Sequence, residues 1–268
     1  MSSSVLYQRD GLVATLTIDR EERRNAMTFE TIASLRAGIA RAREEGDVRV
    51  IVITGAGDRA FCAGAELGGL RGEQIDAEEA HAGRGHLAGL FNDMASSGIP
   101  TIAKVRGYAL AGGMGVALAC DFVLAADDAV FGVPEVARGL WPYMVSVPLL
   151  RSMPSKVVLD LMLTGRRVTA LEGQEIGFVN TVVPAEELDA AVAALAGTIA
   201  ANSPSAIRLG RTAFYRVLGM PAEQALAVLH ATLSVATATD DAREGVAAFQ
   251  EKREPVWGSK APASGSEA

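Results

Sequence analysis

The chain has 268 residues, of which 49% are hydrophobic and 21% are charged, and its formal net charge at pH 7 is −7. A chain of this length and composition can bury a large core, which predicts a folded globular protein. The negative charge disfavours binding to a nucleic-acid backbone. The sequence also lacks a typical export signal and any apolar run of about 18 residues. We therefore expect a cytoplasmic protein with no nucleic-acid or membrane partner.

The first half of the sequence alternates extended and helical patterns. Asp10-Gly11 predicts a tight turn between two strands, because this dipeptide readily adopts positive φ angles. Apolar spacing predicts a helix over residues 28–46, with a threonine cap at its start and a glycine at its end. Residues 48–55, VRVIVITG, predict a strand buried on both faces. Similar alternation over residues 101–126 indicates an α/β architecture with mostly parallel strands.

The sequence after residue 67 becomes increasingly helical. Residues 68–86 have weak periodicity and predict a mobile surface segment. Ser155 is expected to cap a short helix, and TALE at residues 169–172 matches a capping box. The Ala-rich remainder of the chain predicts a series of helices. We therefore divide the chain into a mixed α/β catalytic core, residues 1–200, and a helical C-terminal region with a frayed tail, residues 201–268.

Two loops that follow predicted strands are rich in small residues, CAGAEL at residues 62–67 and LAGGMG at residues 110–115. If the second loop opens a helix, its first amides lack intrahelical partners and lie at the electropositive end. The missing side chains let an oxygen approach closely. Each loop alone is explained equally well by close packing of a helix on a sheet. As a pair, they favour a pocket in which one amide from each loop holds a developing oxyanion.

The sequence shows no pattern typical of a cofactor or metal site. Neither glycine loop has the G-x-G-x-x-G spacing or the Lys-Ser/Thr of a nucleotide-binding loop. Cys62 and Cys120 lie far apart in sequence and near no histidine, so we expect reduced, buried thiols. The expected protein uses neither a metal nor a bound cofactor.

Several ordered motifs resemble those of the enoyl-CoA hydratase/isomerase (crotonase) family. They are RRNAM, FCAGAEL, RGYALAGGMGVALACD, FGVPEVARGL, LMLTGRRVTALEGQEIGFVNTVVP and DDAREGVAAFQEKREP, and the resemblance runs over roughly residues 5–257. It implies a superhelix of repeated ββα turns and a helical C-terminal trimerisation region. It also implies an acyl-CoA thioester substrate, so that coenzyme A is part of the substrate, and a homotrimer or homohexamer.

The resemblance also implies a set of site residues. By position in the motifs, the amides of Ala65 and Gly112 are expected to hold the thioester oxygen as it becomes an enolate, and Glu135 of FGVPE is expected to act as the acid/base. Glu135 could equally cap a helix. An apolar pocket would raise the pKa of its carboxyl group by desolvation. The other expected substrate-binding residues are Arg24, Ala63, Gly64, Trp141, Tyr143, Phe249 and Lys252.

These residues have different expected roles. Arg24 and Lys252 resemble family positions near the nucleotide phosphates, and Phe249 resembles one close to the coenzyme A site. Trp141 and Tyr143, in GLWPYM, depart from the glycine-rich family pattern and are expected to narrow the acyl pocket. Core packing is the competing explanation for Tyr143.

One carboxylate of the family pattern is missing. Family hydratases typically share the addition of water between two glutamates, and Gly115 stands at the first of the two positions. A single carboxylate suffices to move a double bond, which favours a 3-enoyl-CoA isomerase that uses Glu135 alone. The prevalence of hydratases in the family favours an enoyl-CoA hydratase, which we rank first. A catalytically weak acyl-CoA binder and a decarboxylase or hydrolase are the further alternatives.

Overall fold

The computed structural model describes residues 4–65 and 76–258 and contains two sheets. The six-stranded sheet has the order β1-β2-β3-β5-β7-β10, and the four-stranded sheet has the order β4-β6-β8-β9. The strands of the larger sheet are β1 (Val5–Asp10), β2 (Val13–Ile18), β3 (Val50–Gly55), β5 (Thr101–Val105), β7 (Phe122–Ala126) and β10 (Thr181–Val183). Those of the smaller sheet are β4 (Ala60–Cys62), β6 (Tyr108–Leu110), β8 (Val130–Gly132) and β9 (Arg167–Thr169).

Successive strand pairs contribute one strand to each sheet. The pairs β3-β4, β5-β6 and β7-β8 follow one another along the chain, and a helix follows each pair. Within these units, neighbouring strands of each sheet are parallel, whereas β1 pairs antiparallel with β2 and β8 with β9. The expected repeated ββα turns and mostly parallel pairing are therefore confirmed.

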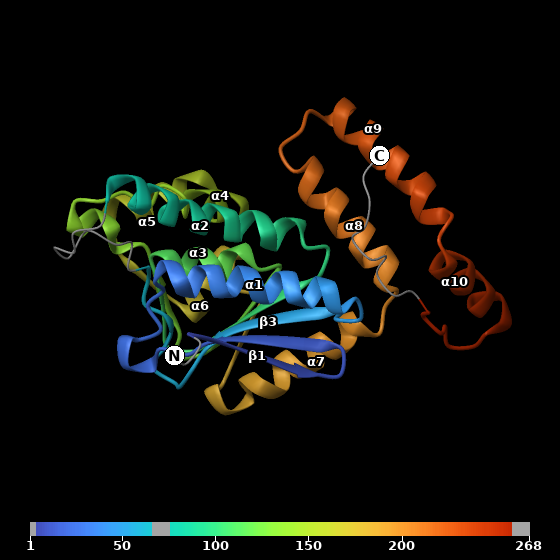
Figure 1. Cartoon of the computed structure of the whole chain (residues 1–268), viewed down its shortest axis with the longest axis horizontal. Coiled ribbons are helices and arrows are strands. Elements are labelled where there is room, and N and C mark those ends of the chain that lie inside the picture. The colour runs from blue at the N-terminus through green and yellow to red at the C-terminus, as the bar shows by residue number, and fades with distance from the viewer. Residues whose placement is uncertain (1–3, 66–75, 259–268) are drawn as a thin grey trace.

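The helices form layers around the sheets, with a C-terminal group to one side (Figure 1). α1 and α7 lie on opposite sides of the larger sheet, and α8–α10 form an arm beside the core. The α-helices are α1 (Phe29–Glu45), α2 (Ala77–Ser96), α3 (Gly112–Ala119), α4 (Ser146–Ser152), α5 (Ser155–Thr164), α6 (Ala170–Ile176), α7 (Leu188–Ala200), α8 (Pro204–Val217), α9 (Ala222–Thr237) and α10 (Asp240–Glu251). Three short 3-10 helices are η1 (Glu21–Arg23), η2 (Pro134–Arg138) and η3 (Ala185–Glu187). The division of the chain at residue 200 stays a prediction.

Local sequence signals explain where several helices begin and end. The Thr28 side chain accepts a hydrogen bond from a first-turn amide of α1, and Gly46 ends that helix at φ 74°. Thr169 caps α6 by accepting from the amide of Glu172, and Gly177 ends it at φ 100°. The predicted starts of α1 and α6 and the predicted end of α1 are confirmed.

Two local predictions are wrong. Ser155 does not cap α5, because the N-cap residue is Pro154 and Ser155 is already the first helical residue. The expected mobile surface segment 68–86 is helical from Ala77 onward, where α2 starts. Its weak periodicity conceals a helix that packs along α1, and residues 68–75 lie outside the described part of the chain.

β3 is buried on both faces, as its unbroken apolar sequence predicts. Ile51 and Ile53 belong to the main core beneath α1 and α2, whereas Val50 and Val52 belong to a smaller apolar cluster against α7. Side chains alternate between the two faces of a strand, so one strand joins both clusters. No single described helix is long and apolar enough to cross a bilayer. The bent pair 185–200 and 204–217 meets that criterion by length and composition only, with an angle of 101°.

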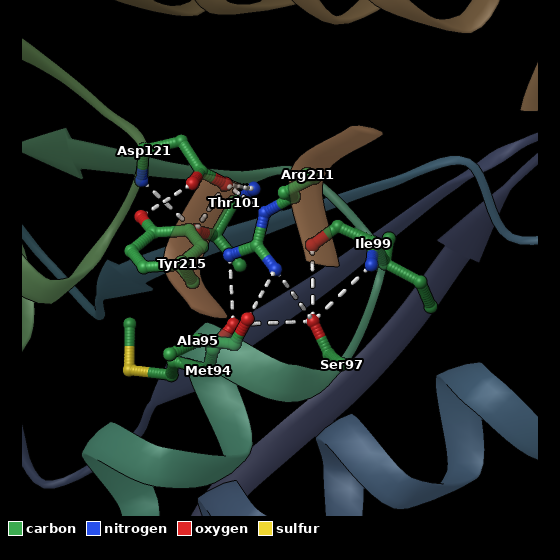
Figure 2. Close-up of polar contacts among 8 residues, drawn as sticks. All are labelled: Met94, Ala95, Ser97, Ile99, Thr101, Asp121, Arg211 and Tyr215. Carbon is green, nitrogen blue, oxygen red and sulfur yellow. Dashed lines mark hydrogen bonds and ion pairs between the residues drawn. The ribbon is translucent and has the colours of Figure 1, made fainter. Parts of the chain in front are cut away.

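A buried polar cluster attaches α8 to the core (Figure 2). Arg211 Nε donates to Asp121 Oδ2 at 2.8 Å, and Tyr215 Oη donates to Asp121 Oδ1 at 2.7 Å. Arg211 also donates to the Met94 carbonyl at 2.7 Å, and the Thr101 amide donates to Asp121 Oδ2 at 2.7 Å. The side chains of Arg211 and Asp121 are only 8% and 15% exposed. Both charges are therefore withdrawn from water and depend on each other.

We expect Arg211→Met to lower the free energy of unfolding by about 3 kcal/mol, because it leaves the Asp121 carboxylate buried without its cation. Chemical denaturation would measure the change. The matched control is Arg243→Met, which breaks an exposed pair with Asp240 and should change stability by less than about 1 kcal/mol. Equal losses in the two variants would contradict a special role for the buried pair.

Candidate active site

Three segments leave the same edge of the smaller sheet. β4, β6 and β8 are parallel neighbours, so their carboxyl ends lie side by side. The segments that follow are residues 63–65, 111–112 and 133–135, which contain Ala65, Gly112 and Glu135. The Ala111 amide donates to the Gly132 carbonyl at 2.8 Å and ties two of these strand ends together. Chain topology alone therefore gathers the three expected catalytic residues at one edge.

The two glycine loops meet closely. A Cβ atom built on Gly112 would lie 3.4 Å from the amide nitrogen of Ala65. A Cβ atom on Gly113 would lie 2.2 Å from the Cys62 carbonyl oxygen, a distance that no side chain tolerates. Gly112 is the first residue of α3, so its amide has no partner within the helix. The structure thus brings together the two backbones from which a pair of oxyanion donors was expected.

The backbone at the start of α3 is unusual. Ala111, its N-cap residue, has φ 51° and ψ −125°, which L-residues rarely adopt. The turn redirects the chain from β6 into α3 within one residue. Backbone strain of this kind costs on the order of 1–3 kcal/mol and is concentrated at functional sites.

A second segment supports the loop that contains Ala65. The Ala63 amide donates to the Arg24 carbonyl at 3.0 Å, and the Met27 amide donates to the Gly64 carbonyl at 2.9 Å. The expected substrate-binding residues Arg24, Ala63 and Gly64 are therefore adjacent in space. The exposed Arg24 side chain starts directly beside the loop.

Asn25 holds this supporting segment in place and was missed in the sequence. It is fully buried and adopts a left-handed conformation with φ 55°. Its Nδ2 donates to the carbonyls of Ala56 and Ala60 at 2.9 and 2.6 Å, and its Oδ1 accepts from the Arg20 amide at 3.0 Å. Asparagine is among the few residues that tolerate this conformation, which was the available signal in RRNAM.

Glu135 is the second residue of η2 and is half-buried. Among the described residues its Oε2 is buried and has no hydrogen-bond partner. Desolvation by burial raises the pKa of this carboxyl group, and a hydrogen bond to its own backbone and the nearby Arg138 lower it by smaller amounts. A carboxyl group with a raised pKa exchanges protons more readily near neutral pH than an exposed one. The N-cap residue of η2 is Val133, so Glu135 is not the helix cap, and its acid/base role stays a prediction.

The position of the missing carboxylate is filled by apolar side chains. A Cβ atom on Gly115 would lie 3.0 Å from Phe91 Cζ and 3.1 Å from Val145 Cγ2. Both contacts are tighter than ordinary van der Waals distances, so even an alanine would require a shift. Among the described residues, the atoms closest to this Cβ position all belong to these two apolar side chains.

The remaining expected substrate-binding residues are less closely grouped. Trp141 is half-buried and packs against the main core, but Tyr143 is 77% exposed, so core packing does not explain it. Phe249 is 85% exposed on α10, and Lys252 follows that helix. Figure 1 places α10 at the far end of the arm, away from α3. One chain therefore does not bring Phe249 and Lys252 to the site.

Comparison with known proteins agrees with this geometry. The family model described as enoyl-CoA hydratase/isomerase matches residues 8–260. The crystal structure of an enoyl-CoA hydratase from Mycobacterium smegmatis superposes with a TM-score of 0.90 at 32% identity, and the match covers 95% of this chain and 98% of that one. The chain therefore belongs to the enoyl-CoA hydratase/isomerase family and is an enzyme with the crotonase fold.

Two curated relatives show what this similarity includes. The Mycobacterium tuberculosis protein named "Probable enoyl-CoA hydratase echA8" is 36% identical over 255 residues, which cover 95% of this chain and 97% of that protein. The carnitinyl-CoA dehydratase of Escherichia coli K12 is 35% identical over 263 residues, which cover 96% and 99% of the two chains. Both relatives match almost end to end and carry names for water addition or removal on acyl-CoA compounds.

We expect Asn25→Ala to lower kcat by on the order of tenfold while KM changes much less, because an oxyanion donor, the role expected of Ala65, acts mainly on the transition state. Steady-state kinetics at a temperature where circular dichroism shows a folded protein would measure this. Asn25→Gly keeps the left-handed conformation without the amide and should show the same loss. Full activity in Asn25→Gly would show that the amide does not position the loop.

Proposed function

We propose that the protein is an enoyl-CoA hydratase, which adds water across the 2,3 double bond of an acyl-CoA thioester. The observation that carries this proposal is the meeting of Ala65, Gly112 and Glu135 at three adjacent strand ends. The thioester carbonyl itself supplies the electron sink, so the proposed reaction needs neither a metal nor a separate cofactor. Coenzyme A belongs to the substrate.

The proposed steps follow from the chemistry of each group. Water attacks C3, and the electron pair of the double bond moves to the thioester oxygen, which the amides of Ala65 and Gly112 hold. One such preorganised donor is worth about 2.7–4 kcal/mol of transition-state stabilisation. Glu135 takes the proton from the attacking water and delivers it to C2 as the thioester reforms. A single carboxylate thus completes the addition with all atoms balanced.

The packing around Gly115 favours a second candidate, a 3-enoyl-CoA to 2-enoyl-CoA isomerase. Phe91 and Val145 form an apolar wall where a second carboxylate would help to orient water. Isomerisation needs no water: Glu135 removes a proton from C2 and returns it at C4 while both amides hold the dienolate. A catalytically weak acyl-CoA-binding protein would use the same pocket without turnover.

Substrate binding is proposed to involve more than one copy of the chain. Arg24 starts beside the oxyanion loop and is proposed to contact the nucleotide phosphates, whereas Phe249 and Lys252 would reach a site only in a neighbouring copy. The arm exposes many large apolar side chains, which a second copy would cover. They include Phe214, Leu218, Leu226, Leu229, Leu233, Val235, Val246 and Phe249.

We therefore expect a homotrimer or homohexamer. Light scattering should give about three or six times the chain mass of 27.9 kDa. Paired substitutions Leu226→Glu and Leu233→Glu, at side chains that are 65% and 61% exposed, should yield monomers that remain folded. A monomeric wild-type protein would exclude shared sites between copies.

The proposed acid/base is tested by Glu135→Gln. We expect this variant to lose at least 100-fold in turnover, because glutamine cannot transfer a proton. Mass spectrometry of crotonyl-CoA and 3-hexenoyl-CoA reactions distinguishes the candidates, since hydration adds the mass of one water and isomerisation leaves the mass unchanged. Glu175→Gln, at an exposed position on α6, is the matched control. Unchanged turnover in Glu135→Gln would remove Glu135 from the mechanism.

Glu135→Gln should also differ from the wild type in how its melting temperature depends on pH. The native pKa of Glu135 is raised, so the stability linked to its protonated form is present at low pH and is lost as pH rises through that pKa. Glu135→Gln should therefore melt near the wild-type temperature at about pH 4 and above it at about pH 8. Calorimetry at the two pH values would measure this. A lower melting temperature at about pH 8 would contradict the desolvated carboxylate.

A further inference from the structure

The Phe91 side chain lies beside Gly115 of α3 on one side and lines a cavity on the other. On one side its Cζ lies 3.0 Å from the Cβ position of Gly115, within the turn of α3 that follows the proposed oxyanion donor. On the other side it lines a cavity of about 380 Å³. The ring is half-buried and packs against the main core. Phe91 therefore stands between the candidate active site and this cavity.

The cavity lies between the end of α3, α4 and α8. Its wall combines the apolar side chains of Leu118, Ala119, Pro148, Phe178 and Phe214 with polar and charged side chains. The volume is within the range of about 300–1,000 Å³ that small-molecule sites occupy. The cavity is thus large enough for several methylene groups and offers them apolar side chains on its wall.

Several polar groups on the cavity wall already have hydrogen-bond partners within the protein. Asp121 accepts from Arg211, Tyr215 and the Thr101 amide (Figure 2), and Ser152 donates to the Pro148 carbonyl at 2.8 Å. A charged or strongly polar ligand would have to disrupt these bonds. An apolar chain only needs the free apolar wall, so it is the ligand class that the lining favours.

α3 leads from the site to the cavity. Gly112 opens the helix, Gly115 follows one turn later, and Leu118 lines the cavity at the other end. With a rise of about 1.5 Å per residue, the path from Gly112 to Leu118 is about 9 Å long. An acyl chain whose thioester oxygen rests at Gly112 and which runs along this helix meets the Phe91 ring before it reaches the cavity.

We propose that Phe91 is a specificity-determining residue, which closes the acyl site in front of the cavity and restricts the protein to short acyl chains. This inference rests on the proposed acyl-CoA function. Removal of the ring joins the two compartments, and the distal carbons of a longer chain then enter the cavity. Gly115 itself contributes no side chain at this point, and the other wall beside it is Val145, whose Cγ2 lies 3.1 Å from the Gly115 Cβ position.

The test compares Phe91→Ala with the wild type on crotonyl-CoA and 2-decenoyl-CoA. We expect the ratio of kcat/KM for the long over the short ester to rise by on the order of 100-fold in Phe91→Ala. Phe91→Trp should lower the same ratio. The double variant Phe91→Ala with Ala119→Phe fills the cavity again and should lose the gain. Val147→Ala, which enlarges the cavity from the α4 side while the ring of Phe91 stays, should leave the ratio unchanged.

Binding measurements separate this inference from the proposed reaction. Calorimetry can measure the Kd values of butyryl-CoA and decanoyl-CoA, which are saturated and do not react. The ratio of the butyryl-CoA Kd to the decanoyl-CoA Kd should rise in Phe91→Ala by a factor similar to that of the kcat/KM ratio. If the wild type turns over no ester but the Kd ratio shifts, the proposed reaction fails and the role of Phe91 stands. An unchanged Kd ratio in folded Phe91→Ala overturns the inference. Phe91→Leu gives the same readout with a smaller expected shift if Phe91→Ala does not fold.

Discussion

The approach of two backbones, at Gly112 and Ala65, is the constraint on which the rest of the candidate site depends. A Cβ atom at Gly113 would meet the Cys62 carbonyl at 2.2 Å, so α3 can start here only with glycine at its second position. Closely approaching backbones leave amides, not side chains, as the polar groups that face a substrate. The expected acid/base, Glu135, follows the next strand end of the same sheet.

Much of the fold could be predicted because its signals are local. The turn after Asp10, the cap at Thr28 and the capping box at Thr169 each depend on a few neighbouring residues. The mistaken cap at Ser155 has the same origin, since the preceding proline already supplies an extended entry to the helix. α2 was missed over its first turns because glycines and charges there obscure the apolar face that packs along α1.

The sequence located only those residues of the candidate site that come shortly after a strand. Ala65, Gly112 and Glu135 each lie two or three residues beyond a strand end, which local patterns and family motifs could locate. The packing of Phe91 and Val145 around Gly115 joins segments that lie far apart in the sequence, so no local pattern reports it. For the same reason, the sequence did not show that α10, with Phe249, lies away from the site of its own chain.

The anchor of α8 has a consequence for how the arm and the site communicate. Asp121, which receives Arg211 and Tyr215, stands two residues beyond the end of α3, and Gly112 stands at the beginning of the same helix. A helix of eight residues is too short and too tightly buried to bend independently. A tilt of the arm would therefore be passed along α3 to its opposite end, so the position of α8 and the orientation of the Gly112 amide are mechanically linked.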